Sequence, residues 1–137
     1  MIKKRISEVS KLAGVSKRTL QYYDDEGVLV AERSENNHRL YDEEMLEQIW
    51  RIIVYKGLGF ELKEIRQLLQ GSREEQKEYL GLRIENIRSE IQQLNEQLEL
   101  ISFVLKYGMP RIPEEGEGKT YVEEMDEWKR RIFSSLI

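Results

Sequence analysis

The sequence contains no cysteine, a single histidine, two prolines and no apolar run of membrane-spanning length. Without cysteine there are no disulfides, thiolate metal sites or cysteine nucleophiles. One histidine leaves only carboxylates as further metal ligands, and no glycine-rich phosphate loop is present. The N-terminal stretch MIKKRIS lacks the apolar segment of a signal peptide. We therefore expect a soluble cytoplasmic protein that is not an enzyme, holds no cofactor or metal and contacts no membrane.

Charge is abundant but unevenly distributed along the 137 residues. Charged residues make up 35% of the chain, and the net charge of −4 at first argues against a nucleic-acid partner. Residues 1–41 carry eight Lys and Arg against six Asp and Glu, a balance of +2, whereas residues 71–137 carry ten against fourteen, a balance of −4. A weakly basic head on an acidic body can bind DNA if its positive groups share one face.

The first 27 residues have the pattern of two short helices joined by a turn. Residues 7–13 suit one helix, Gly14 permits a tight turn, and Ser16 is a good N-cap for a second helix that runs to about Asp25. Gly27 is well placed to end it. This is a helix-turn-helix pattern, but unrelated helical hairpins share the spacing. At this point DNA binding and plain packing both remain open.

The next segment, residues 28–41, predicts a β-hairpin. Two short extended runs surround the polar cluster at residues 34–37. Arg33 and Arg39 flank this turn, with His38 and Tyr41 beside the second run. Cations on a hairpin that follows a helix-turn-helix are typical of a wing that grips phosphate. The alternative is a surface loop with scattered charge.

Helical signals continue from Asp42 to residue 107. Asp42 caps a third helix, KGLGF at 56–60 breaks it, and residues 61–69 form a fourth helix that Gly71 ends. Ser72 and Glu75 form a capping box that starts a helix over 73–107, on the order of 50 Å long. Its apolar positions recur in steps of four and three, as in a coiled-coil seam, and predict a homodimer. They are Leu80, Ile84, Ile87, Ile91, Leu94, Leu98, Ile101 and Leu105.

The remaining residues predict a loop at 109–118 and an amphipathic helix over 120–136. In one interpretation, the apolar side chains of this helix simply pack on the coiled coil or on the partner's head. In the other, they line an effector pocket for a small apolar or cationic ligand, with acidic side chains as counter-charges. The residues predicted for this pocket are Tyr107, Tyr121, Glu124 and Trp128.

Several of these motifs occur in the order found in one protein family. The stretches ISEVSKLAGVSKRTLQYYDDEGVL, NHRLY and IIVYKGLGFELKEIRQLL precede a long coiled coil. Over residues 5–105 the chain resembles MerR-family transcription regulators, and among them the multidrug and thiostrepton-induced activators (TipA-like and Mta-like). The resemblance implies a mainly α fold with a winged helix-turn-helix head (1–71), an antiparallel coiled-coil dimerisation helix (72–107) and a short C-terminal segment with one helix (108–137).

The resemblance also implies a function. In the family, a homodimer binds a palindrome of double-stranded DNA inside a promoter and distorts it, in response to an effector, so that RNA polymerase can engage. The chain departs from the family pattern at Gln21, where Arg is common, at Ala31, where Pro is common, and at Asn37 and His38, which replace Gly-Tyr. Only about 30 residues follow the coiled coil, whereas members of this subgroup often carry a whole effector domain there.

The predicted DNA contacts lie in the second helix, in the wing and at two lysines further on. We assign Lys17 and Arg18 to bases or phosphates, Thr19 to phosphate or a thymine methyl, and Tyr23 mainly to the core. Ser16 is either a cap or a contact. The full set is Ser16, Lys17, Arg18, Thr19, Gln21, Tyr22, Arg33, His38, Arg39, Tyr41, Lys56 and Lys63.

Two questions stay open from the sequence. The acids at 24–26 either contact the basic residues 3–5 or repel wrong docking poses. The alternative function is a protein-interaction module that uses the coiled coil and the C-terminal helix and has no effector.

Overall fold

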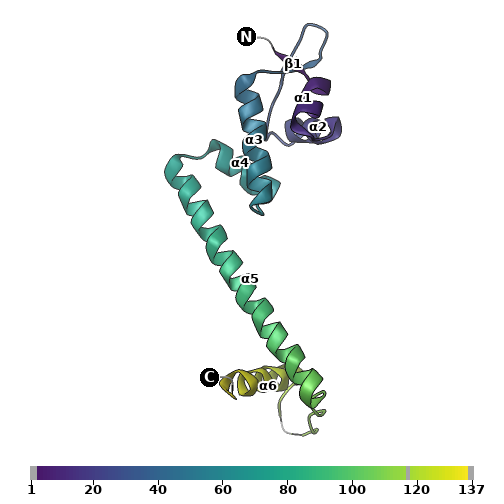
Figure 1. Cartoon of the computed structure of the whole chain (residues 1–137), viewed down its shortest axis with the longest axis vertical. Helices are drawn as coiled ribbons and strands as arrows, with labels where there is room; N and C mark the ends of the chain where they lie inside the picture. Colours follow the sequence, from purple (N-terminus) through teal and green to yellow (C-terminus); the bar gives the residue numbers. More distant parts are fainter. Residues whose placement is uncertain (1–2, 117, 136–137) are drawn as a thin grey trace. The chain divides into compact units, whose positions relative to one another are not determined.

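The computed structural model describes residues 3–116 and 118–135, and the chain divides into two compact units, Met1–Arg83 and Ile84–Ile137. The first unit combines helices with a small sheet (Figure 1). Its helices are α1 (Ile6–Ala13), α2 (Lys17–Asp25), α3 (Glu43–Gly57) and α4 (Leu62–Gln70), followed by the start of α5 (Arg73–Tyr107). Its strands are β1 (Lys4–Arg5), β2 (Glu32–Arg33) and β3 (Arg39–Tyr41).

The turn between α1 and α2 forms as the sequence predicts. Gly14 adopts a left-handed conformation, with φ of 72°, and its N–H donates to the Ser10 carbonyl at 3.0 Å. The Ser16 hydroxyl accepts the Thr19 N–H at 3.0 Å and so caps α2. Gly27, with φ of 69°, follows the end of α2 and donates to the Asp24 carbonyl at 3.0 Å. The predicted helix-turn-helix is therefore present.

The predicted hairpin is formed by β2 and β3, with Arg33 opposite Arg39. Together with β1 it makes a three-stranded antiparallel sheet in the order β1-β3-β2. Its turn lies at residues 34–37, as predicted, and Asn37 has the positive φ of 63° that a tight turn favours in Asn. The sequence did not predict β1. This strand of two residues carries no local alternation and exists because β3 offers it an open edge.

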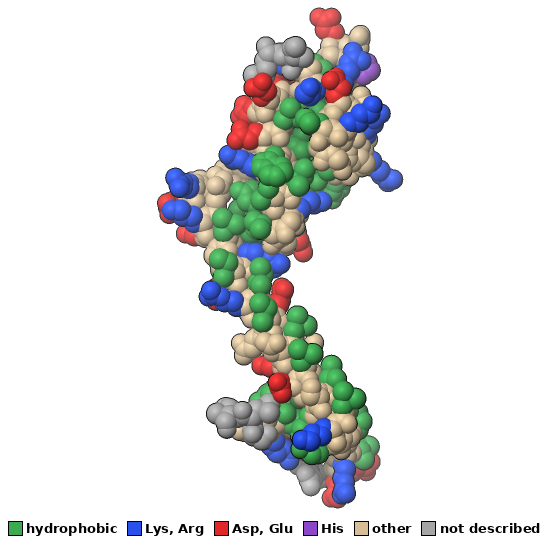
Figure 2. All heavy atoms as spheres, in the orientation of Figure 1, with side chains coloured by type: hydrophobic (Ala, Val, Ile, Leu, Met, Phe, Trp, Pro, Cys, Tyr) green, Lys and Arg blue, Asp and Glu red, His purple; other side chains and the backbone are tan. Residues whose placement is uncertain are grey.

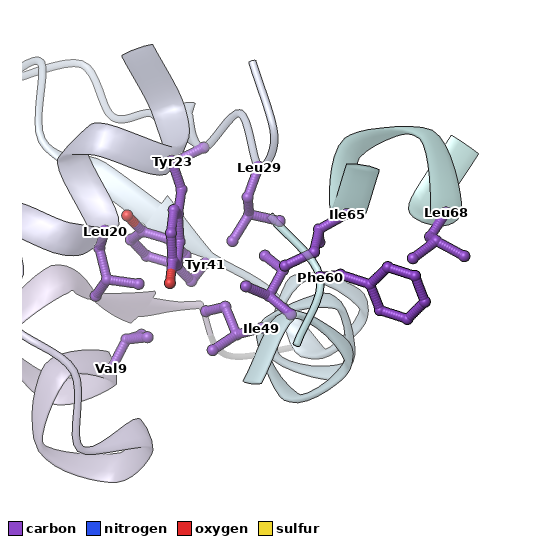
Figure 3. Packing of buried hydrophobic residues seen from close by; sticks show 11 residues of the cluster. Val9, Leu20, Tyr23, Leu29, Tyr41, Ile49, Phe60, Ile65 and Leu68 are labelled. Carbon is purple, nitrogen blue, oxygen red and sulfur yellow. The ribbon is translucent and has the colours of Figure 1, made fainter. Parts of the chain in front are cut away.

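The helices enclose one hydrophobic core in the first unit (Figure 3). Figure 3 shows that side chains from α1, α2 and β3 meet those of α3 and α4 in this cluster. Tyr23 lies within it, 2% exposed, which confirms its predicted place in the core. The buried residues are Val9, Leu20, Tyr23, Leu29, Ala31, Tyr41, Ile49, Ile52, Phe60, Ile65 and Leu68.

The first turns of α5 are fixed to this head. The predicted capping box forms, since the Ser72 hydroxyl accepts the Glu75 N–H at 3.2 Å. Leu80 packs partly against the core, and Arg83 Nε donates to the Leu58 carbonyl at 3.0 Å. Gly59 has φ of 92°, and a Cβ there would lie 2.3 Å from Arg83 Nη2. The glycine therefore leaves room for Arg83 to reach the loop between α3 and α4.

The second unit contains the rest of α5 and helix α6 (Tyr121–Ser135). The Thr120 hydroxyl caps α6 by accepting the Glu123 N–H at 3.1 Å. Trp128 of α6 meets Phe103 of α5 edge to face, with ring centroids 5.7 Å apart, and Ile132 is buried. These contacts fit the packing interpretation of the C-terminal helix. Its predicted end at residue 136 lies outside the described residues.

Across residues 3–116 and 118–135, we find no helix that has both the length and the apolar character of a membrane span.

Candidate nucleic-acid interface

The N-terminal turn of α2 presents the first group of predicted DNA contacts. Lys17 and Arg18 are exposed, and in the described part of the chain neither forms an ion pair. Their charges lie at the helix end where free backbone N–H groups already favour an anion. The Ser16 hydroxyl is engaged as the cap and also lies 2.8 Å from the Thr19 hydroxyl. Ser16 and Thr19 thus hold the turn that carries the two cations.

Further along α2, the two tyrosines point to opposite environments. Gln21 and Tyr22 are exposed, whereas Tyr23 is buried. The Lys56 ammonium lies 5.6 Å from the centroid of the Tyr23 ring, as a cation–π pair. Lys56 of α3 is therefore tied to the end of α2. Lys63 is exposed on α4.

The wing contributes Arg33 and His38 as exposed groups. His38 is exposed beside the turn, and its backbone N–H donates to the Ser34 hydroxyl at 3.1 Å. Arg33 keeps 42% of its side chain exposed, and its Nη1 donates to the Asn37 carbonyl at 3.3 Å. Both side chains are accessible to a phosphate backbone.

Arg39 is held differently from the other wing cations. Its Nε donates to Asp24 Oδ2 at 2.8 Å, and only 17% of its side chain is exposed. Arg33 Nη2 lies 3.8 Å from the same Asp24 oxygen, and Arg39 Nη2 lies 3.9 Å from Asp25 Oδ1. The acids at the end of α2 therefore face the wing.

This arrangement contradicts one explanation that the sequence offered for these acids, contact with residues 3–5, and leaves the other, repulsion of wrong docking poses, untested. Lys3 bonds to Glu32, and among the described residues no ion pair joins residues 3–5 to residues 24–26. The partner of Asp24 lies 15 residues away, on β3. The sequence did contain a signal for this pairing. Two acids end the second helix, and the hairpin that follows carries one arginine on each side of its turn.

Tyr41 requires a correction. The sequence predicts it as a wing contact, but its side chain is 1% exposed in the core, so it offers DNA no surface. In β3, Arg39 and Tyr41 are two positions apart and therefore share a face of the strand, and this face is turned toward the protein. The Tyr41 hydroxyl has no hydrogen-bond partner among the described residues, and burial raises the pKa of this phenol.

Replacing Tyr41 with Phe tests that correction. If the chain binds DNA as the resemblance implies, we expect its affinity to stay unchanged. The thermal midpoint should stay equal or rise, because removal of an unpaired buried hydroxyl relieves a penalty of about 1 kcal/mol. Differential scanning calorimetry and a DNA titration measure the two quantities. A loss of affinity with an intact midpoint would show that the phenol reaches DNA.

The predicted dimer seam is largely uncovered in the single chain. Leu80 packs partly against the core of the first unit, and the other seven side chains are 37% to 82% exposed. Figure 2 shows hydrophobic side chains following one another along α5. An apolar stripe of this length on one helix is characteristic of a surface that another helix covers.

Three of the four residues predicted for an effector pocket line one hollow. Tyr121, Glu124 and Trp128 line a hollow of about 520 Å³ in the second unit. The predicted place of Tyr107 is wrong, because this side chain does not line the hollow. It packs instead on Phe103, with ring centroids 4.7 Å apart. The sequence missed the contribution of the loop before α6 and of two positive charges, Arg111 and Arg131. The other lining residues are Pro110, Arg111, Ile112, Pro113, Met125 and Arg131.

A possible metal site would need several ligating side chains close together. In the described ranges, no group of three or more His, Cys, Asp and Glu side chains is placed to hold a metal ion.

Comparison with known proteins supports the interpretation of the first unit as a winged helix-turn-helix. Residues 4–72 match the model of the "MerR HTH family regulatory protein". The transcriptional activator TipA of Streptomyces coelicolor is 32% identical over 114 residues, which cover 80% of this chain and 45% of TipA. The chain spans less than half the length of the curated relatives that it matches first.

Solved structures share the fold. The N-terminal part of Mta, the multidrug transporter activator of Bacillus subtilis, aligns with a TM-score of 0.70 and 30% identity, over 75% of this chain and 98% of that one. The regulator EcmrR in complex with DNA aligns with a TM-score of 0.63 and 27% identity, over 76% of this chain and 39% of that one. The predicted resemblance to TipA and Mta is thereby confirmed.

Proposed function

Because the chain belongs to the MerR family of helix-turn-helix regulatory proteins, we propose that it is a transcription regulator whose homodimer binds a palindromic promoter operator. The dimer distorts this DNA and so controls the access of RNA polymerase, the partner that family membership implies. The expected cytoplasmic location follows from this proposal, since promoter DNA lies there. Its relatives TipA and Mta are transcriptional activators rather than enzymes.

One observation carries the proposal. Lys17 and Arg18 stand exposed and unpaired, among the described residues, on the first turn of the second helix of a winged helix-turn-helix. In this motif the second helix enters the major groove with its N-terminal residues on the base edges. Arg33 and His38 are exposed on the adjacent wing and can hold the flanking backbone. EcmrR, which shares the fold, was determined bound to DNA.

The exposed stripe on α5 supports the dimer. A single head reads only a few base pairs, whereas two heads related by a two-fold axis read a palindrome and combine their binding energies. Since Leu80 and Arg83 fix the start of α5 to the head, the pairing of two α5 helices would set the separation of the two recognition helices. Distortion of a duplex costs on the order of 1–6 kcal/mol, so a clamp of defined span is a suitable device for it.

Selection from random-sequence duplex DNA tests this function. We expect the purified chain to enrich a palindrome, and footprinting to show protection in both half-sites. Permanganate probing of promoter DNA with RNA polymerase then reports whether the regulator promotes opening. If the chain enriches no sequence, the proposal fails, and the result favours the alternative of a protein-interaction module.

The second unit favours an added effector function. Its hollow has two aromatic walls, Tyr121 and Trp128, and its charged lining groups are Glu124, Arg111 and Arg131. With two cations against one anion, this lining does not favour the cationic ligand that the sequence suggested. We propose an apolar aromatic ligand that is neutral or carries an acidic group.

Tryptophan fluorescence tests the effector site. In a Trp50→Phe variant, emission comes from Trp128 alone, and a bound aromatic acid is expected to quench it and raise the thermal midpoint. Trp128→Ala should abolish the midpoint shift. A compound that shifts the midpoint equally in Trp128→Ala binds elsewhere and contradicts the assignment.

A further inference from the structure

Three cation–carboxylate contacts converge at the end of α2. Asp24 Oδ2 accepts Arg39 Nε at 2.8 Å and lies 3.8 Å from Arg33 Nη2, and Arg39 Nη2 lies 3.9 Å from Asp25 Oδ1. The two arginines come from different strands of the wing, β2 and β3. One carboxylate therefore joins both wing strands to the recognition helix.

An acid at this position is unfavourable unless it has a partner. The C-terminal end of a helix carries partial negative charge, and DNA would add the field of its phosphates. Asp24 is nevertheless only 12% exposed, which removes much of its hydration. The charge-assisted bond from Arg39 offsets these costs and explains why a carboxylate stands beside a nucleic-acid interface.

We propose that Asp24 is a positioning residue that fixes the wing against α2, so that wing and recognition helix meet DNA together. The inference rests on the proposed DNA-binding function and deepens it. Arg39 is the tether, because its side chain is largely covered. Arg33 is shared, because it is more exposed and more distant from Asp24, and it keeps donors for a phosphate. The benefit is entropic: a wing already held in place loses less freedom on binding.

Removal of the Asp24 charge separates this role from simple repulsion. If Asp24 only repelled phosphates, Asp24→Asn would tighten DNA binding. A tether predicts the opposite: about tenfold weaker binding of the palindromic duplex that the wild-type chain selects, since a charge-assisted bond is lost in each protomer. Glu26→Gln is the matched control. It removes one carboxylate just beyond the same helix end, and Glu26 is exposed.

A double-mutant cycle and footprinting give the decisive readouts. Asp24→Asn, Arg39→Gln and the double variant should show strong coupling, with the double variant no weaker than the worse single one. In Asp24→Asn, hydroxyl-radical protection of the DNA backbone should disappear where the wing contacts it and persist where α2 contacts it. Asp24→Glu, which keeps the charge, should recover part of the affinity.

Several results would overturn the inference. These are unchanged or tighter binding by Asp24→Asn, additive effects of the two single variants, or a wing footprint identical to that of the wild type. If Asp24→Asn unfolds, the comparison of Arg39→Gln with Arg39→Lys answers the same question, since lysine can still pair with Asp24. Failure of the proposed function would look different, because the wild-type chain itself would then select no duplex.

Discussion

Replacing Ile91 with Asp is expected to convert the dimer into monomers and to abolish operator binding at concentrations where the wild type saturates its DNA. Ile91 lies in the middle of the apolar stripe on α5, and 52% of its side chain is exposed in the single chain. In a coiled coil it would be covered by the partner helix. The substitution forfeits roughly half of the 1.5–3 kcal/mol that full burial of such a side chain is worth in each protomer, and it places an unpaired carboxylate in the seam.

Because the change occurs in both protomers, the dimer dissociation constant should rise by at least about a thousandfold. Sedimentation equilibrium measures this directly, and a DNA titration reports its consequence. Ser89→Asp is the matched control: it adds the same charge two residues earlier, about 200° around the helix, on the face away from the seam. A variant Ile91→Asp that remains dimeric would refute α5 as the dimerisation helix.

The long helix was well predicted because its signals are local. The capping box at Ser72 and Glu75 and the glycine at 108 mark its two ends, and the structure places α5 at Arg73–Tyr107, as the sequence indicates. The helix-turn-helix was equally accessible, since Gly14 and Ser16 act within one turn of their own positions. In such cases the chain within a few residues determines the conformation.

Features that depend on distant segments were missed. β1 exists only because β3 pairs with it, and Arg39 is covered only because Asp24 reaches it from α2. A strand as short as β3 has no periodicity from which its inner face could be read, so Tyr41 was assigned to the wrong side. Composition correctly located the cations of the wing, but tertiary contacts decide which of them are free to bind DNA.

Arg18→Ala is expected to weaken operator binding by roughly a hundredfold or more. One good contact between Arg and a base edge is worth about 1–3 kcal/mol, and it recurs in both half-sites of a palindrome. Arg51→Ala is the matched control, since it removes the same side chain from the same head. Among the described residues, Arg51 pairs with Glu47 of its own helix alone, at 3.6 Å, in an exposed pair that adds little stability. We expect its affinity to stay within about twofold of the wild type.

The conservative variant Arg18→Lys determines what Arg18 contacts. Lysine keeps the charge but lacks the fork that pairs with two acceptors of guanine, so a base contact would be lost and a phosphate contact largely kept. Binding to operator variants then separates the cases: a base contact in the wild type implies relaxed specificity at one position in Arg18→Lys, whereas a phosphate contact implies an unchanged sequence preference. Unchanged affinity in Arg18→Ala would remove α2 from the interface and, with it, the observation that carries the proposed function.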